Sequence, residues 1–217
     1  VLGLRERVTA NRQTHRRTLS IDECPIFSPV IERIFPAVID FVREKGLAVF
    51  DILSGHGHVR HLVLRQGKRT GELMAILVTA ELPGTDLAVL AERLMADVPE
   101  LKSFVHVTNS RPSDLVEHQK TRLVAGAPFI EETLLGLTFR VYPQTFFQTN
   151  TAGAELLYRR IRDEAPLSPE SHVLGLYCGS GAIELSLAGA VRQVTGVDSS
   201  PANIANAVEN ALVNRVE

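Results

Sequence analysis

The sequence has no tryptophan, only two cysteines and no long apolar run. No stretch approaches the roughly 18 consecutive apolar residues that a membrane span needs. The N-terminus also lacks the apolar segment of a signal peptide. Two cysteines far apart in the chain, Cys24 and Cys178, cannot make a disulfide framework. These absences disfavour membrane and disulfide-rich secreted proteins, and we expect a cytoplasmic protein.

The composition is otherwise that of an ordinary globular chain, with 45% hydrophobic and 22% charged residues. Its 217 residues allow one large domain or two small ones. A net charge of −2 gives no general attraction to polyanions. Positive charge is concentrated in the first 17 residues, at Arg5, Arg7, Arg12, Arg16 and Arg17. This arm could contact phosphates, although a solvated strand edge or loop is the simpler interpretation.

The first 145 residues read as a small α+β domain. Residues 1–22 suggest short strands or an arm. Apolar spacing predicts a helix over 30–45 that Gly46 ends and Pro36 breaks or kinks, and a second helix over 86–98. Strands are predicted over 59–65, 73–79, 102–108 and 134–141, the last broken at Gly136. A sheet with one face covered by helices accommodates this order.

Residues 146–217 carry the most informative pattern. A helix is predicted over 150–164, and an apolar strand over 173–177 leads into a turn that contains Gly179 and Gly181. A helical run follows, and then a short strand over 193–197 that ends at Asp198. This is the opening β-α-β of a sheet that binds a nucleoside cofactor: the glycines admit the ligand, and the acid accepts hydrogen bonds from ribose hydroxyls. We therefore expect an incomplete α/β domain here, with a boundary at 145/146.

Two cofactors fit such a unit. A dinucleotide site favours a third glycine, which lets the helix pack closely on the strand, but Glu184 occupies that position. S-adenosylmethionine carries no phosphate and needs only the turn glycines and the acid. The residues thus favour the methyl donor. A tight turn in an unrelated α/β protein is the simpler alternative.

Several motifs together resemble those of bacterial RNA uracil-C5 methyltransferases, with the 23S ribosomal RNA branch the most similar. The resemblance covers nearly the whole chain. The motifs are Glu23-Cys24-Pro25-Ile26, the strand Arg60–Arg65, Phe146-Phe147-Gln148-Thr149-Asn150, Tyr177-Cys178-Gly179-Ser180-Gly181, Gly196-Val197-Asp198, and the helical run with Asn206, Asn210 and Asn214. The chain would be a fragment that lacks both ends of such an enzyme.

The resemblance implies a Rossmann-like S-adenosylmethionine-dependent domain and assigns cofactor contacts to Gln148, Tyr177 and Asp198, beside Gly179 and Gly181. An amide, an aromatic ring and a carboxylate suit the methionine end, the flank and the ribose of the cofactor, respectively. Two positions depart from the family pattern. Gly175 replaces a strand carboxylate, and Ala182 stands where some members have a polar residue. Both changes could weaken cofactor binding.

The family's nucleophilic cysteine and general base are expected beyond Glu217, so no catalytic residue is assigned in this chain. The resemblance gives Cys178 no catalytic role. Cys24 matches the last of four cysteine ligands of a 4Fe-4S cluster, whose other three ligands are expected before Val1. One thiolate cannot hold such a cluster. Cys24 is therefore either an orphaned ligand or an ordinary buried cysteine.

The expected function is methylation of uridine C5 in RNA by the full-length parent, with ribosomal RNA as the expected substrate, RNA as the partner and a monomeric state. The chain alone is expected to be inactive. Three alternatives stay open: an RNA-binding α+β module with a vestigial cofactor fold, a methyltransferase with another substrate, and an NAD(P)-linked oxidoreductase.

Overall fold

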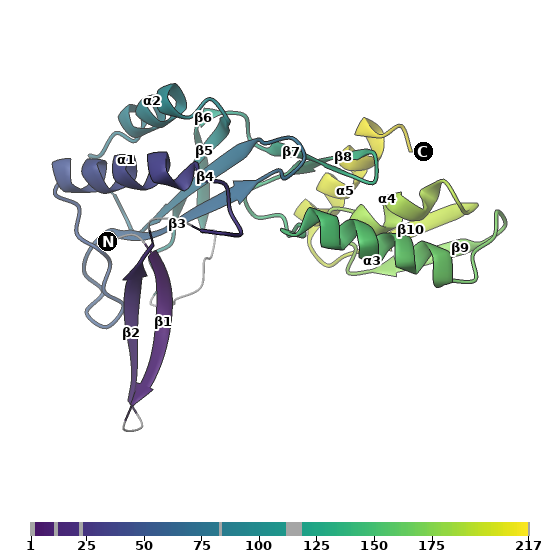
Figure 1. The fold of residues 1–217 in the computed structure, drawn as a ribbon, viewed down its shortest axis with the longest axis horizontal. Helices are drawn as coiled ribbons and strands as arrows, with labels where there is room; N and C mark the ends of the chain where they lie inside the picture. Colours follow the sequence, from purple (N-terminus) through teal and green to yellow (C-terminus); the bar gives the residue numbers. More distant parts are fainter. Residues whose placement is uncertain (1–2, 11–12, 22–23, 83, 112–118, 217) are drawn as a thin grey trace. The chain divides into compact units, whose positions relative to one another are not determined.

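The computed structural model describes residues 3–10, 13–21, 24–82, 84–111 and 119–216. The chain forms two compact units (Figure 1). One contains Val1–Leu64 and Ala75–Ala127, and the other contains Arg65–Met74 and Pro128–Glu217. This division differs from the sequence boundary at 145/146, because residues 128–145 pack with the helices that follow them. Arg12 of the basic arm lies outside the described residues.

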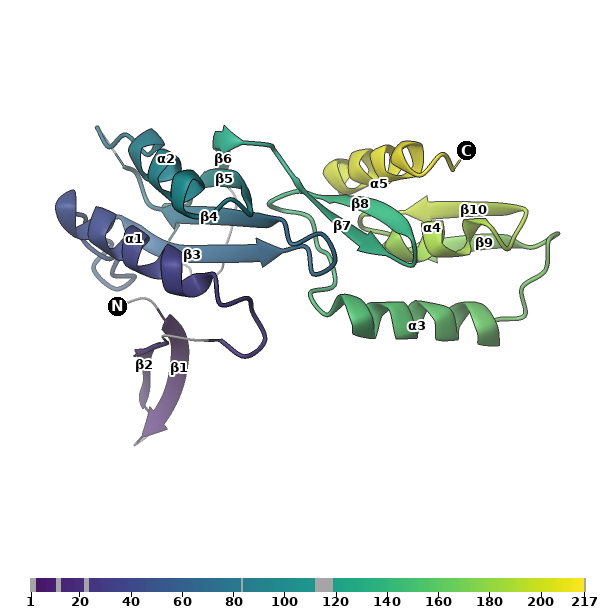
Figure 2. The ribbon, with the colours of Figure 1, turned by 45° about the horizontal axis from the view of Figure 1, so that its top comes forward.

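The first unit begins with a hairpin and continues into a four-stranded sheet. Strands β1 (Gly3–Ala10) and β2 (Gln13–Ser20) pair antiparallel. The sheet has the order β3-β4-β5-β6, formed by Val59–Gln66, Leu73–Thr79, Leu101–Thr108 and Lys120–Gly126. Helices α1 (Ile31–Glu44) and α2 (Ala88–Asp97) lie side by side on one face of it (Figure 2). The core of this unit includes Ile34, Phe41, Leu90, Leu94 and Phe104.

Helix α1 confirms one sequence prediction and corrects another. Gly46 follows the helix with φ 61°, and its N–H donates to the Arg43 carbonyl, so this glycine ends the helix as predicted. Of the break or kink predicted at Pro36, the break is wrong, since the helix runs through this residue, and the kink stays a prediction. Ile34, Val38 and Phe41 are buried, and this packing outweighs the loss of one backbone hydrogen bond.

The second unit begins with a hairpin that the sequence only half predicted. Strands β7 (Ile130–Leu134) and β8 (Leu137–Val141) pair antiparallel, so the predicted strand over 134–141 is two strands. The two-residue turn between them, Leu135 and Gly136, has φ of 53° and 81°. Positive φ at both positions defines the turn type that matches the twist of a hairpin.

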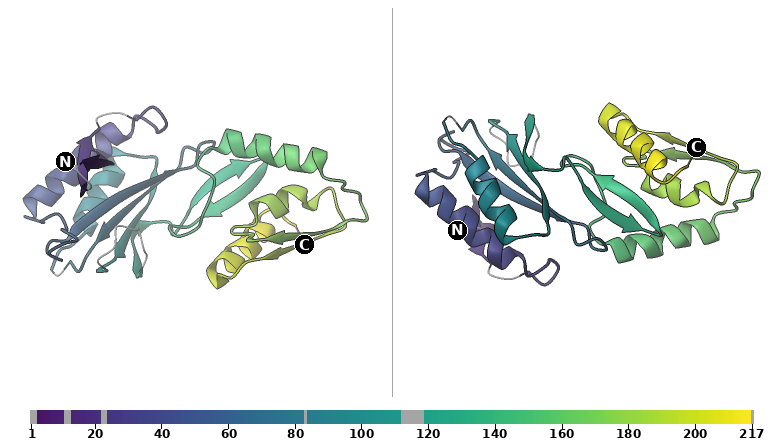
Figure 3. Two further views of the ribbon diagram at one scale, coloured as in Figure 1. Left: turned by 90° about the horizontal axis from the view of Figure 1, so that it is seen from below. Right: turned by 90° about the horizontal axis from the view of Figure 1, so that it is seen from above.

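After the hairpin, the second unit continues with one helix, the predicted β-α-β and a further helix (Figure 3). Helix α3 (Thr151–Glu164) precedes strand β9 (His172–Leu176), helix α4 (Ala182–Ala188), strand β10 (Gln193–Val197) and helix α5 (Pro201–Val213). Strands β9 and β10 are parallel, with Gly175 opposite Gly196. The predicted α/β fold class is confirmed. In the part of the chain described, no helix combines the length and apolarity of a membrane span.

Candidate cofactor site

The site is built around the turn that joins β9 to α4. Tyr177, Gly179 and Gly181 all take the left-handed backbone region, with φ of 57°, 56° and 79°. Glycine adopts this region freely, whereas for tyrosine it costs about 1–2 kcal/mol. The strained backbone holds the Tyr177 side chain 89% exposed at the end of β9. Such strain at the mouth of a site is typical of a functional position.

Asp198, at the end of β10, joins this turn to the start of α5. Its Oδ2 accepts from the Gly179 N–H at 3.0 Å, and its Oδ1 accepts from the Ser200 N–H at 2.8 Å and from Asn203 Nδ2 at 3.1 Å. The Cys178 N–H also donates to the Val197 carbonyl at 3.0 Å. The structure therefore brings Gly179 and Asp198 into direct contact.

These donors fix the charge of Asp198. Hydrogen bonds from Ser200, Gly179 and Asn203 stabilise the ionised form and hold the pKa of the carboxyl below its usual value. An ionised carboxylate has about four acceptor positions, and the three donors leave about one for a ligand hydroxyl. The carboxylate was expected to accept hydrogen bonds from both hydroxyls of a ribose diol. Because the turn and the start of α5 already use three acceptor positions, only about one is left for the ribose.

Ser200 and Asn203 also belong to the candidate site, although the sequence did not predict them. The Ser200 hydroxyl accepts from the Asn203 N–H at 3.4 Å and caps α5, whose first residue is Pro201. A serine followed by proline is a recognisable start of a helix. That signal, two residues after the acid, could have predicted that the helix start would orient Asp198.

The Glu184 side chain occupies the space beside Gly175, the position at which this chain departs from the family pattern. A Cβ built on Gly175 would lie 1.9 Å from Glu184 Oε1, and one built on Gly196 would lie 3.7 Å from Glu184 Cγ. The two paired glycines thus make a notch that the side chain from α4 occupies. Glu184 Oε2 is buried and has no partner among the described residues. Burial raises the pKa of this carboxyl, since little stabilises its charge.

Cys178 lies beside this notch, and its Sγ would be 3.0 Å from a Cβ on Gly196. Burial, and then the nearby charges of Glu184 and Asp198, raise the pKa of its thiol. A protonated thiol is a poor nucleophile. The absence of a catalytic role for Cys178 stays a prediction.

Gln148 lies in the segment between β8 and α3. Phe147 is buried against Phe139, with ring centroids 5.6 Å apart, whereas Phe146 and Gln148 are exposed. Asn150 caps α3 by accepting from the Gly153 N–H at 2.9 Å. Within the described residues no hydrogen bond joins Gln148 to the β9–α4 turn, so its predicted cofactor contact stays a prediction.

Two asparagines of α5 and its C-cap residue, Asn214, hold this helix on the hairpin. Asn214 and Asn210 accept from the backbone N–H groups of Thr138 and Arg140, both at 2.8 Å. Asn206 donates to the Arg140 carbonyl at 3.1 Å, and Asn210 also donates to the Ser180 carbonyl at 3.1 Å. The four-residue spacing places all three on one helix face. They tie the free edge of β8 to the glycine turn.

A cavity of about 290 Å³ lies between α4, β10 and α5. Its lining includes Cys178, Glu184 and Gly196 but neither Tyr177 nor Asp198. The chemistry-bearing residues therefore surround the open turn, not this mostly apolar cavity.

Cys24 does not come together with other ligands in the structure. In the described ranges, no group of three or more histidine, cysteine, aspartate or glutamate residues could hold a metal ion. The residues present do not fit an iron–sulfur cluster, and no step of the proposed chemistry uses one.

Known proteins are similar to this chain over almost its whole length. No family model matches. The chain is 33% identical over 205 residues to an uncharacterized RNA methyltransferase of Geobacter sulfurreducens, covering 94% of this chain and 41% of that protein. It is 34% identical over 200 residues to one of Clostridium tetani, covering 91% and 44%. The chain thus spans less than half the length of these curated relatives.

One solved structure has a closely similar fold. It is the Pyrococcus abyssi tRNA (uracil-54, C5)-methyltransferase in complex with S-adenosyl-L-homocysteine, with a TM-score of 0.77 and 29% identity. The similarity covers 93% of this chain and 48% of that one. The chain therefore has the fold of S-adenosylmethionine-dependent methyltransferases and is similar to proteins named RNA methyltransferases.

Proposed function

We propose that this chain contributes the cofactor-binding turn and an RNA-facing domain to an enzyme that methylates uridine at C5 in RNA. S-adenosylmethionine would supply the methyl group. Ribosomal RNA is the proposed substrate, on the motif resemblance, and transfer RNA is the second candidate, on the named activity of the structural neighbour.

The observation that carries the proposal is the link between Asp198 and Gly179. The carboxylate holds the glycine turn through its Oδ2 and keeps acceptor capacity for a ribose hydroxyl. Tyr177 presents its ring beside this turn, where it can lie against the cofactor. Gln148 is proposed to bind the methionine end, which has both donor and acceptor groups.

The turn is less suited to a dinucleotide. A pyrophosphate binds where a helix N-terminus offers free N–H groups and positive potential. Helix α4 is short, and Glu184 lies in its first turn, over the notch at Gly175. A carboxyl at this position occupies the space that close helix–strand packing needs. This argument disfavours NAD(P) and leaves the phosphate-free methyl donor.

Uracil C5 becomes nucleophilic only after a thiolate adds to C6. Cys178 is not proposed to supply that thiolate, because burial and its acidic neighbours raise the pKa of its thiol and so disfavour the ionised form. The nucleophile and the base that removes the C5 proton are proposed to come from the part of the longer protein that this chain does not include.

The test is tritium release by the protein encoded by the complete gene. RNA transcribed with [5-³H]uridine loses tritium when C5 is methylated, and methyl-labelled S-adenosylmethionine reports transfer in parallel. We expect equal amounts of released tritium and transferred methyl. Methyl transfer without tritium release would show another target atom and overturn the assignment to C5.

The RNA-binding module is the competing proposal. The same assay separates the two, because a module with a vestigial fold binds RNA but transfers no methyl group. Asp198→Ala should abolish methyl transfer, whereas Asp163→Ala, an equal change of charge at an exposed position of α3, should not.

A further inference from the structure

The first unit contains a second, unassigned cluster of polar side chains, which surrounds a cavity of about 280 Å³ between β5, β6 and the segment after β4. Six of the lining residues carry its chemistry: Glu81, Thr85, His106, Thr108, Lys120 and Arg122. We call it the His106 pocket. The volume lies just below the roughly 300–1,000 Å³ typical of small-molecule sites.

The strand pairing explains why these side chains meet. His106 pairs with Arg122, and Thr108 pairs with Lys120, across β5 and β6. Directly opposed residues share a face of the sheet, and so do positions two apart along a strand. The register therefore places all four side chains on one face. Lys120 and Arg122 are exposed, and neither side chain makes an ion pair or hydrogen bond with another described residue.

His106 has a defined hydrogen-bonding state. The Thr79 hydroxyl donates its single proton to the Ala80 carbonyl at 2.6 Å, so it must accept from His106 Nε2, which is 2.8 Å away. In the neutral ring, Nδ1 is then a bare acceptor. Burial, and next the charge of Arg122, lower the pKa of His106, while Glu81 opposes this change. This lower pKa favours the neutral ring.

We infer that the His106 pocket binds one sugar–phosphate unit of single-stranded RNA, with Lys120 and Arg122 on the phosphate and His106 Nδ1 accepting from the ribose 2′-hydroxyl. The inference rests on the proposed RNA substrate and extends it to a specific subsite. Two unpaired cations suit a phosphate, and a fixed acceptor suits a hydroxyl that RNA has and DNA lacks. Within the described residues, no phenylalanine, tyrosine or tryptophan lines the pocket, so we do not assign its affinity to base stacking.

The first test measures binding of the 217-residue chain to a fluorescein-labelled single-stranded RNA by fluorescence anisotropy across a salt series. Lys120→Ala with Arg122→Ala should weaken binding by at least about tenfold at low salt, since both charged hydrogen bonds to the phosphate are lost. The salt slope should fall by about 0.7 for each phosphate that the variant no longer neutralises. Arg43→Ala with Lys45→Ala removes the same charge from the end of α1 and should leave both quantities unchanged.

The second test compares RNA with deoxyuridine-containing DNA of the same sequence. The unchanged chain should prefer RNA, and His106→Phe should lose that preference while its affinity for DNA stays the same. A structural role for His106 would instead lower both affinities. Thermal unfolding checks that each variant is folded.

Equal loss of binding in the α1 control pair, no preference for RNA over DNA, or no RNA binding at all would each overturn the inference. The proposed cofactor site is measured separately, by calorimetric titration of the same samples with S-adenosyl-L-homocysteine. Cofactor binding without RNA binding contradicts the His106 pocket alone. RNA binding through Lys120 and Arg122 without cofactor binding contradicts the methyltransferase proposal and leaves the pocket standing.

Discussion

The Asn214 side chain makes two hydrogen bonds to the backbone of Thr138, in the way that the backbone of a neighbouring strand would. Its Nδ2 donates to the Thr138 carbonyl at 2.7 Å, and its Oδ1 accepts from the Thr138 N–H at 2.8 Å. One side chain of α5 thereby satisfies both backbone groups at the free edge of β8. An unpaired strand edge is open to non-native pairing, and covering it protects the hairpin.

Asn214→Ala should lower the free energy of unfolding by about 1–3 kcal/mol, because both groups of Thr138 lose their partner. Urea denaturation followed by circular dichroism measures this change. Leu212→Ala on the same helix removes a side chain that is 71% exposed and should change stability by less than about 0.5 kcal/mol. Equal effects of the two substitutions would contradict the role of the asparagine.

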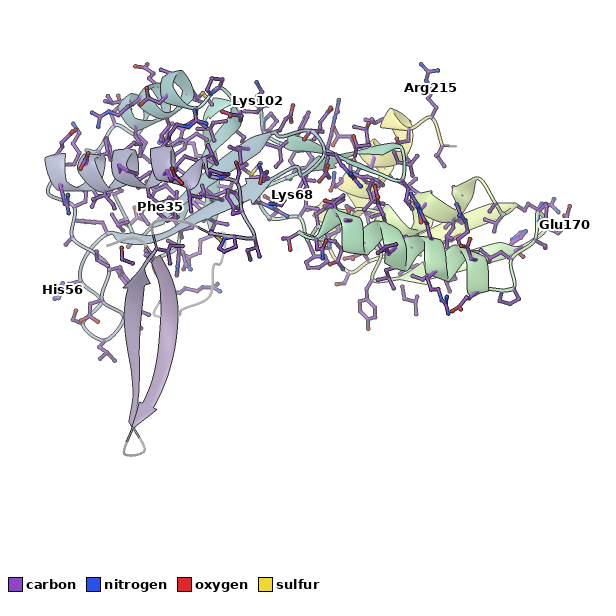
Figure 4. All side chains as sticks on the ribbon, viewed as in Figure 1. Phe35, His56, Lys68, Lys102, Glu170 and Arg215 are labelled. Atoms are coloured by element: carbon purple, nitrogen blue, oxygen red, sulfur yellow. The ribbon has the colours of Figure 1, made fainter. Side chains whose placement is uncertain are left out.

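Glu132 is a buried carboxylate that holds the loop between β3 and β4. Its Oε2 accepts from the Lys68 N–H (Figure 4) and the Thr151 hydroxyl, both at 2.6 Å. Its Oε1 accepts from the N–H groups of Arg69 and Thr133 at 3.0 and 2.7 Å. Four donors therefore converge on one side chain.

Glu132→Ala should destabilise the second unit by about 3 kcal/mol or more, because several donors lose their acceptor at once. The matched control is Glu170→Ala, at an exposed position that makes only a surface pair with Arg192 (Figure 4). The control should stay within about 0.5 kcal/mol of the unchanged chain. Thermal melts of both variants compare their stabilities. A small loss of stability for Glu132→Ala would contradict the proposed role of Glu132 in holding the loop between β3 and β4.

Gly175 and Glu184 compete for the same space, because a side chain at position 175 would overlap the Glu184 carboxyl group. Gly175→Ala alone puts a methyl group where Glu184 Oε1 lies and should destabilise the chain. Glu184→Ala alone removes a buried oxygen without a partner among the described residues and should be neutral or stabilising. In the double variant the methyl group has room, so the cost of Gly175→Ala should shrink by about 0.5–3 kcal/mol. Strict additivity in a double-mutant cycle would show that the two side chains do not compete.

The lowered pKa of Asp198 should make the stability of the folded chain depend on pH. Hydrogen bonds from Ser200, Gly179 and Asn203 lower the pKa of its carboxyl in the folded chain, so its contribution is complete above the unfolded value of about 3.9. That contribution is lost as the pH falls through the lower, folded pKa. The unchanged chain and Asp198→Asn should therefore differ in melting temperature at pH 7 and converge only as the pH falls below about 3.9 and through the folded pKa. A difference that persists at low pH would show that charge is not the cause.

The sequence predicted the β-α-β and its acid because glycine turns and apolar strands leave local signals. Glycine at 179 and 181 and an acid after the second strand are readable without knowledge of the rest of the fold. The hairpin β7–β8 was half missed because its left-handed turn begins with Leu135, which is not a turn-forming residue. Strand β6 was missed because its edge position leaves it largely exposed, without an apolar pattern.

The contacts of the site that depend on packing could not be read from the chain. In the sequence, Glu184 only marks a departure from the dinucleotide motif. The structure shows that its side chain occupies the notch formed by Gly175 and Gly196. The His106 pocket likewise depends on the pairing of β5 with a strand that the sequence did not predict. In both cases the decisive neighbours lie on different elements, beyond the reach of a local pattern.

Calorimetric titration of the 217-residue chain with S-adenosylmethionine and, separately, with NADH tests the central claim most directly. We predict saturable binding of S-adenosylmethionine that Asp198→Ala abolishes and Asp163→Ala preserves, and no heat of binding for NADH. Saturable binding of NADH, or a signal for the methyl donor that Asp198→Ala leaves intact, would contradict the account.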